Sequence, residues 1–292
     1  MMRFLEHRIA DKRILRLIAK WLKAGVIAKD GHTERSTRGA PHLRSSSASC
    51  GSAPLKWAVV SPILANVYLH YALDLWVHRW RQQMASGDVA IIRYADDFIV
   101  GFQHEHEAKA FLQDLQERLR KFELALHPAK TRLIRFGRFA AKQREMRGEG
   151  KPETFDFLGF THFCTRSHKS GGFVIGRKTI KKRMVAKLKA LKVELRKRMH
   201  DSIAATGEWL NLLLKGHLNY FAVPGNVQSL WWFFHEVQWR WLRSLRRRSQ
   251  KAYLSWKKFD RLTGRYFPPI KILHPLPLLR FDARTQGRSP VR

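Results

Sequence analysis

The feature that most limits the folds open to this chain is a pair of β-rich arms joined by a short acidic turn. The arms are Val89–Tyr94 and Phe98–Phe102, and Ala95-Asp96-Asp97 connects them. Runs of this length and composition around a polar turn predict a β-hairpin. Apolar residues recur at spacings of three and four over 63–76 and over 108–122, which predicts amphipathic helices that flank the hairpin. The sequence therefore predicts an α+β fold with an antiparallel sheet.

Upstream of the hairpin, a stretch without periodicity interrupts the helical pattern. Apolar residues over 4–28 fall mostly on one face and predict a helix. The segment 35–58 is rich in Ser, Arg, Gly and Pro, and we expect a solvated loop or a disordered insertion there. Helical spacing resumes at Val59, and Pro62 is expected in the first turn of that helix, where its missing N–H would have no partner anyway.

Beyond Gly176 the chain changes from mixed strands and helices to basic helices. Residues 177–199 hold eleven Lys and Arg against one acidic residue, and their apolar residues form one seam. Further helices are expected at 207–221 and 227–248, separated by Pro224-Gly225-Asn226. The expected domains are an α+β domain at 1–176, with strand-like pieces at 131–136 and 154–163, an all-α domain at 177–265 and a C-terminal tail at 266–292.

The charge balance restricts the partners of the chain. Its 292 residues contain 56 Lys and Arg against 23 Asp and Glu, so the formal net charge is +33. Such an excess demands a polyanionic partner, and nucleic acid is the natural candidate. The alternatives are a ribosomal-type structural protein, against which the 12% aromatic content argues, and a membrane-surface binder, for which the sequence offers no lipid-facing helix.

Targeting signals and cysteine frameworks are not expected. No apolar run approaches the roughly 18 residues of a membrane span, and the charged start has no signal-peptide pattern. We therefore expect a cytoplasmic location and no membrane partner. Cys50 and Cys164 lie far apart and are expected to be ordinary reduced thiols.

The two carboxylates of the acidic turn admit two explanations. Asp is common in turns because its side chain bonds nearby backbone amides, which alone would explain Asp96 and Asp97. Adjacent carboxylates repel each other, however, and a divalent metal ion gives a reason to keep both. A pair of Mg²⁺ ions activates a 3′-hydroxyl and stabilises leaving pyrophosphate in nucleotidyl transfer. We therefore expect Mg²⁺ as a cofactor.

Several ordered segments together resemble the reverse transcriptases and maturases encoded by group II introns. Tyr94-Ala95-Asp96-Asp97 is similar to the Tyr-x-Asp-Asp signature of reverse transcriptases. The resemblance covers almost the whole chain except 35–58. It implies a partial polymerase palm, an antiparallel sheet with packed helices, followed by an all-α thumb or maturase domain. The other segments that resemble the family are Val60–Leu69 before the hairpin, Leu126–Thr131 after it, the primer-grip turn at Phe155–Phe160 and the maturase thumb at Gly216–Phe221.

The resemblance also implies catalytic and metal-binding roles. Asp96 would be a metal ligand, and Asp97 would be a second ligand or a support for the first. Lys130 matches a lysine placed to donate a proton to pyrophosphate, a role that general acid catalysis makes sensible. A surface lysine after a proline turn is the alternative reading of Lys130.

Further matching residues are expected at the nucleotide and primer sites. Tyr94 would lie near the incoming nucleotide, and Ser61 and Pro62 belong to the family's segment just before the hairpin. Gly159 would let the primer backbone approach closely because it has no Cβ, and a plain turn glycine is the alternative.

Two departures from the family pattern put catalysis in doubt. The family carries another metal-binding Asp in a Phe-Phe-Asp segment just upstream of the part matched by Phe4–Ile9, and the segment 35–58 replaces a Pro-Gln-Gly-containing link that lines the nucleotide pocket. We therefore expect little or no autonomous polymerase activity. Three hypotheses stay open: a reverse transcriptase and maturase completed by another chain, an RNA-binding maturase with an inert palm, and an inactive relic.

Two cationic segments form the expected RNA-binding surface. They contain few acidic residues, whereas solvated helix faces normally alternate signs. Aromatic residues over 231–241 interleave with the second segment; some could stack on bases, but most are expected in the core. The resemblance implies intron RNA as the partner, and DNA primer or target and dNTPs for an active enzyme. The basic residues of these segments are Arg177, Lys178, Lys181, Lys182, Arg183, Lys187, Lys189, Arg240, Arg243, Arg246, Arg247 and Arg248.

Overall fold

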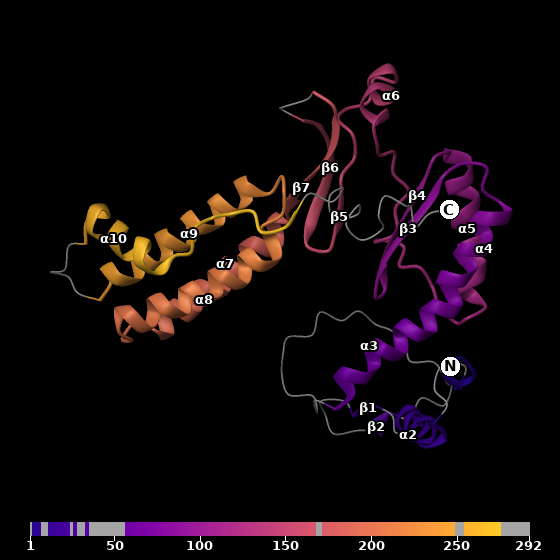
Figure 1. The fold of residues 1–292 in the computed structure, drawn as a ribbon, viewed down its shortest axis with the longest axis horizontal. Coiled ribbons are helices and arrows are strands. Elements are labelled where there is room, and N and C mark those ends of the chain that lie inside the picture. The colour runs from indigo at the N-terminus through magenta and orange to yellow at the C-terminus, as the bar shows by residue number, and fades with distance from the viewer. Residues whose placement is uncertain are drawn as a thin grey trace. The chain divides into compact units, whose positions relative to one another are not determined.

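Helices and antiparallel strands are divided between two units of the chain, Met1–Leu133 and Ile134–Arg292, in a computed structural model (Figure 1). All strand pairs among the described residues are antiparallel, as predicted for a mixed fold of helices and sheets. The domain boundaries expected after residues 176 and 265 stay predictions, and the two units divide at a different point. Most of the segment 35–58 and most of the tail lie outside the described residues. The structure describes residues 2–6, 11–23, 26–27, 33–34, 56–167, 171–248 and 254–275.

The first unit begins with two short helices where one helix was predicted over 4–28. Asp11 accounts for the start of the second, because its carboxylate accepts a hydrogen bond from the backbone N of Arg13 at 2.7 Å, as helix-capping residues do. Residues 26 and 27 are β-branched and pair as a strand, so the prediction was wrong at its C-terminal end. The elements are α1 (Met2–Glu6), α2 (Lys12–Lys23), β1 (Val26–Ile27) and β2 (Thr33–Glu34).

A long helical segment leads to the hairpin and contains two features that the sequence did not predict. Pro62 lies in the helix interior, because the helix begins at Lys56 and not near Val59. The backbone then widens into one π-helical stretch before it returns to α-helix. Such stretches are rare and often accompany functional sites. The segment comprises α3 (Lys56–Leu69), the π-helix η1 (His70–Asp74) and α4 (Leu75–Gln83).

The predicted hairpin and the helix after it are confirmed. Apolar side chains from the two helical segments and the hairpin form one core. Polar contacts reinforce it: the indole N–H of Trp80 donates to Asp114 at 2.7 Å, and the buried Glu107 carboxylate accepts from the backbone N of Ser86 at 2.7 Å. The elements are β3 (Val89–Tyr94), β4 (Asp97–Phe102) and α5 (Glu105–Arg120), and the buried core residues are Leu73, Val77, Trp80, Val89, Phe111, Leu115 and Leu119.

The second unit starts with a short helix and a three-stranded sheet. The strand expected at 131–136 is wrong, because these residues form no strand. The helix expected from residue 177 begins only at Lys181, since residues 173–179 pair with the preceding strand. Arg177 and Lys178 therefore lie on a strand. The elements are α6 (Ala140–Met146), β5 (Phe155–Phe157), β6 (Phe160–Arg166) and β7 (Phe173–Thr179), in the sheet order β5-β6-β7.

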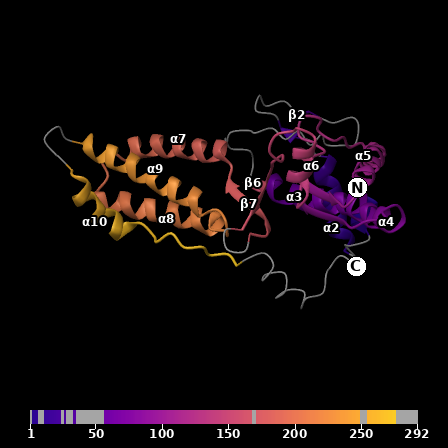
Figure 2. The ribbon, with the colours of Figure 1, turned by 90° about the horizontal axis from the view of Figure 1, so that it is seen from above.

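Four helices complete the second unit and pack lengthwise around an apolar core (Figures 1 and 2). Close approach of the last helix depends on Gly207, where an added Cβ would lie 2.6 Å from the ring of Tyr266. The helices are α7 (Lys181–Lys197), α8 (Ile203–Phe221), α9 (Val227–Arg246) and α10 (Trp256–Tyr266).

Across the part of the chain that the structure describes, no helix combines the length and the apolar character that crossing a bilayer requires.

Candidate functional site

The acidic dipeptide lies at the tip of the β3–β4 hairpin. The strands pair from Val89 opposite Phe102 to Tyr94 opposite Asp97, which leaves Ala95 and Asp96 as a two-residue turn. Ala95 has a φ of +54°, in the left-handed region that costs a residue with a Cβ roughly 1–2 kcal/mol. Strain of this kind persists only where surrounding contacts impose it, and it concentrates at functional sites.

The side chains at the tip face solvent. Asp96 and Asp97 are exposed, and the ring of Tyr94 is 66% exposed. Neither carboxylate forms a hydrogen bond or an ion pair with another residue that the structure describes. The dipeptide is therefore not part of a buried ion cluster with arginines.

Arg93 holds the strained turn in place, and sequence reasoning missed it. Its guanidinium is clamped by both carboxylate oxygens of Asp74, with Nε–Oδ1 at 2.7 Å and Nη2–Oδ2 at 2.6 Å. The remaining nitrogen, Nη1, donates to the side-chain oxygen of Asn66 at 2.8 Å and to the carbonyl oxygen of Ala95 at 2.9 Å. One guanidinium thus ties two helical segments to the backbone of the tip. Bidentate pairs of this kind fix geometry as well as adding energy.

The π-helical stretch supplies the acidic half of this clamp. Asp74 is the last residue of η1, and its Oδ2 also lies 3.4 Å from Nδ1 of His70 at the other end of the stretch. The signal available in the sequence was an arginine inside a β-rich arm, next to the acidic turn. A lone acid on a helix 19 residues upstream gave no hint that it would be the partner.

The tip offers part of a site for a divalent metal ion. Hard cations such as Mg²⁺ prefer carboxylate oxygens, and Asp96 and Asp97 present theirs to solvent. Asp74 cannot contribute freely, because both its oxygens bind Arg93. Within the described ranges, no three side chains of His, Cys, Asp or Glu gather in a metal-binding group. The donor types fit Mg²⁺, but the two carboxylates would leave most of its coordination to water or to phosphate.

The positions of the other predicted catalytic and nucleotide-site residues of the first unit do not test their predicted roles. Lys130 is exposed in a turn where the backbone N of Lys130 donates to the carbonyl of His127 at 3.0 Å. Ser61 and Pro62 lie within α3, and Pro62 is exposed. Their roles toward substrate stay predictions.

Gly159 forms the tight turn between β5 and β6. Leu158 and Gly159 have φ values of +47° and +82°, the pattern of a type I′ turn, which favours glycine. Gly159 is buried, and an added Cβ would lie 3.5 Å from the rings of Tyr220 and Phe221. The Tyr220 hydroxyl donates to the carbonyl of Leu158 at 2.8 Å. Turn geometry and packing on α8 thus give this glycine a structural reason, and its predicted contact with a primer stays a prediction.

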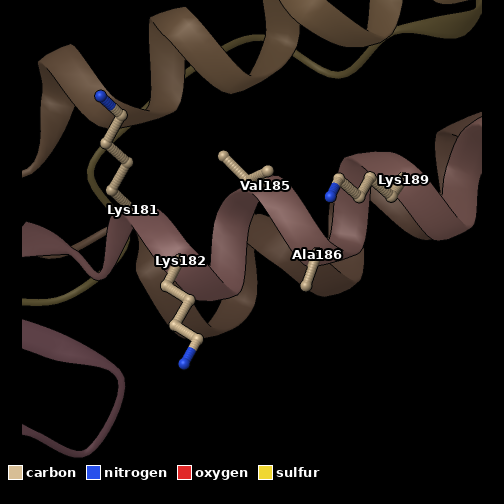
Figure 3. A pocket seen from close by; sticks show the side chains of 5 residues that line it. All are labelled: Lys181, Lys182, Val185, Ala186 and Lys189. Carbon is tan, nitrogen blue, oxygen red and sulfur yellow. The ribbon is translucent and has the colours of Figure 1, made fainter.

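The expected RNA-binding residues of β7 and α7 fall into two environments. Lys181, Lys182, Arg183 and Lys189 are exposed on α7. Three of these lysines line a shallow groove of about 560 Å³ together with Val185 and Ala186 (Figure 3). On β7, burial lowers the pKa of Arg177, and the exposed Lys178 lies over the ring of Phe163 at 5.5 Å.

Lys187 is different, because it points into the helical core toward His217. Its ammonium donates to Nδ1 of His217 at 3.3 Å and lies 5.5 Å from the centre of the Phe233 ring. Burial lowers the pKa of Lys187. Burial, with a smaller effect from the charge of Lys187, lowers the pKa of His217 to about 3. His217 is 2% exposed and neutral at physiological pH. Lys187 is half-buried against it, and its predicted contact with RNA stays a prediction.

The arginines at the end of α9 also separate into surface and structural groups. Arg243 and Arg247 are exposed. Arg246 donates to the carbonyl of Leu254 at 3.1 and 2.9 Å, and Arg248 donates to the carbonyl of Asp201 at 2.7 Å. Arg240 forms an ion pair with Glu236 in the same helix. Removing Arg246 or Arg248 would therefore disturb the fold as well as any surface.

The aromatic residues of α9 alternate between core and surface. Phe233, Phe234 and Trp241 are buried in the helical core. Trp231 and Trp232 are exposed at 62% and 40%, so these rings are available for stacking on unpaired bases.

The buried histidine predicts a pH-dependent stability. The folded His217 has a pKa of about 3 against an ordinary 6.5, so the unfolded chain binds a proton first as the pH falls. The contribution of neutral, buried His217 to the free energy of unfolding is fully present above about pH 6.5, and it falls by about 2 kcal/mol between pH 7 and pH 5. Chemical denaturation at several pH values should show that the free energy of unfolding of the wild type falls more steeply between pH 7 and pH 5 than that of His217→Gln, whose side chain cannot titrate. An imidazole that titrates near 6.5 in the folded protein by NMR would contradict it.

Comparison with known protein families identifies part of the chain. The model of the reverse transcriptase (RNA-dependent DNA polymerase) family matches residues 58–162, which is less than half of the chain. The matched segment includes the Arg93 clamp, the acidic tip and the Gly159 turn. A search of curated proteins found no significant match. Residues 58–162 are therefore similar to a reverse transcriptase domain, whose members act on nucleic acid.

Proposed function

We propose that this chain is an RNA-directed DNA polymerase and maturase of the group II intron type, which binds intron RNA for splicing and for templated DNA synthesis. The observation that carries the proposal is the exposed Asp96–Asp97 pair on a strained turn, inside a segment similar to reverse transcriptases. The Arg93 clamp holds this turn without using either carboxylate, so both stay available for a metal ion.

The proposal assigns a part to each region. Residues 1–176 would form the partial palm, with 35–58 as an atypical insertion, and 177–265 would form the thumb and maturase domain. The four-helix arrangement of α7–α10 and the exposed cations on α7 and α9 support the second assignment. Intron RNA would be the main partner, with DNA primer or target and dNTPs as substrates of an active enzyme.

The residues at the tip would act by binding and orientation. Asp96 and Asp97 would hold Mg²⁺, which when bound supplies charge stabilisation for phosphoryl transfer. Tyr94, with its exposed ring, would contact the nucleotide, and Lys130 would hold the proton passed to pyrophosphate. Ser61, Pro62 and Gly159 would line the nucleotide and primer paths, as the sequence resemblance implies.

We further propose that polymerase activity is impaired. Two carboxylates from one dipeptide are an incomplete ligand set for two divalent ions, and the acid nearest to them on the helical segment, Asp74, is committed to Arg93. A non-catalytic maturase-like RNA-binding protein is accordingly the second candidate, favoured by exposed cations of α7 and α9, such as Lys182 and Arg243, that form no ion pair with a described carboxylate. An inactive relic would bind no RNA.

A primer-extension assay tests the catalytic part. On poly(A)/oligo(dT) with Mg²⁺, the wild type is expected to give little or no synthesis above Asp96→Ala, because the ligand set is incomplete. Robust synthesis that Asp96→Ala abolishes would overturn the proposed impairment and would support an active polymerase.

The salt dependence of RNA affinity tests the binding part. Each phosphate contact to single-stranded RNA contributes about 0.7 to the slope of log affinity against log salt. In a variant with four exposed cations replaced by Gln, this slope should therefore be less steep than in the wild type by up to about three. Filter binding across a range of salt concentrations measures it. The four residues are Lys182, Lys189, Arg243 and Arg247.

A matched variant separates a specific surface from overall charge. Four exposed cations of the first unit, replaced in the same way, change the net charge equally but should leave the slope close to that of the wild type. Equal flattening by both variants would mean that α7 and α9 are not the RNA interface. The four control residues are Arg16, Arg79, Arg120 and Lys121.

A further inference from the structure

A cationic groove lies in the second unit between α6 and the β6–β7 hairpin, away from the basic face of α7 and α9. Its volume is about 580 Å³. Three cations from different elements line it: Arg138 from the turn before α6, Lys142 from α6 and Arg166 from the end of β6. No acidic side chain lines it.

The three cations are not neutralised by acids of the described chain. Arg138, Lys142 and Arg166 are exposed, and none forms an ion pair with a described carboxylate. Two nearby acids are engaged elsewhere, because Glu149 and Glu153 lie 3.2 and 3.8 Å from Nη1 of Arg144, which does not line the groove. Glu145 is exposed on α6 but does not line the groove either. Three uncompensated charges around one hollow repel each other unless an anion binds there.

The floor of the groove lets a ligand approach the backbone. An added Cβ at Gly137 or Gly171 would meet no atom within 4 Å, so the surface above both residues is open. The turn at Gly137 is held on β6 because its backbone N lies 3.4 Å from Sγ of Cys164. The groove is thus formed by backbone and bordered by exposed cationic side chains.

The character of the lining favours a nucleic-acid strand over a small anion. Apart from the cations, Thr165 is the one lining side chain among the described residues that offers a strong hydrogen-bonding group, so little is present to read a base or a specific small ligand. Cations spread over three elements suit successive phosphates of a backbone, which bind without regard to sequence. The half-buried ring of Phe173 adds a surface on which a base can stack.

We propose that this groove binds the phosphate backbone of an RNA strand, as a second contact separate from α7 and α9. The inference rests on the proposed function in that both need RNA as the partner. It adds an RNA site around Arg138, Lys142 and Arg166, none of which belongs to the basic segments predicted from the sequence.

Protection of a lysine in the unaltered protein tests the groove. With a single-stranded RNA oligonucleotide bound, amine-reactive labelling of Lys142, read by mass spectrometry, should fall several-fold. Lys151, an exposed lysine of the same region that does not line the groove, should be labelled as before. Equal labelling of Lys142 with and without bound RNA would overturn the proposal, and so would protection by dNTP alone that RNA does not reproduce.

A variant gives the second readout. Replacing Arg138, Lys142 and Arg166 by Gln should make the slope of log RNA affinity against log salt less steep by about two, at roughly 0.7 per contact. The control replaces three exposed cations outside the groove, Arg147, Lys151 and Lys257, and should leave the slope unchanged. If the wild type binds no RNA, the proposed function fails. If it binds RNA but the groove variant matches the control, only the groove proposal fails.

Discussion

The geometry of the candidate active site depends on one guanidinium. Arg93 is bound on one side by the carboxylate of Asp74 and on the other by the carbonyl of Ala95, so a helical segment and a hairpin tip are joined through the three nitrogens of a single planar group. The bidentate pair satisfies Asp74 and leaves Asp96 and Asp97 as the uncommitted carboxylates. The same contact supports the positive φ of Ala95, which a free hairpin would relax. An exposed acidic pair is thus maintained by a partly buried ion pair beneath it.

The second unit uses its positive charge in two ways. Some cations of the predicted binding surface are structural, since Lys187 donates to a buried histidine, and Arg246 and Arg248 donate to backbone carbonyls that close the helical bundle. Other cations of that surface, on α7 and at the end of α9, are exposed, and so are those around the α6 groove; none of the exposed residues Lys182, Lys189, Arg243, Arg138, Lys142 and Arg166 forms an ion pair with a described carboxylate. Only this second group can contribute to RNA affinity without affecting the fold, and the sequence alone cannot separate the two groups because both have the same composition.

The sequence predicted the parts of the fold that local pattern controls. The hairpin at 89–102, the helix after it and the helices α7, α8 and α9 follow from periodicity and turn chemistry, whereas the short helices α6 and α10 were not predicted. Pairing between separate segments was not predictable. Arg177 and Lys178 were expected in a helix, but they lie on β7 because this segment pairs with β6. The same limit applies to the site, where the acidic tip was visible in the sequence but Asp74, the partner of Arg93, was not. The π-helical stretch that places Asp74 has no sequence signature in a helix of otherwise regular pattern.

Paramagnetic relaxation by Mn²⁺, a substitute for Mg²⁺, measures most directly whether the clamped tip is a divalent-ion site. In the ¹⁵N-labelled protein, low Mn²⁺ should broaden the amide signals of residues 94–97 first. Asp96→Asn should abolish the effect. Arg93→Lys, which keeps the charge but cannot make the fork of contacts, should weaken it while the helical signals of the second unit stay unchanged. Broadening that is equal at other exposed acids, such as Asp88 and Glu145, or absent from the tip would contradict a metal-binding role for Asp96 and Asp97.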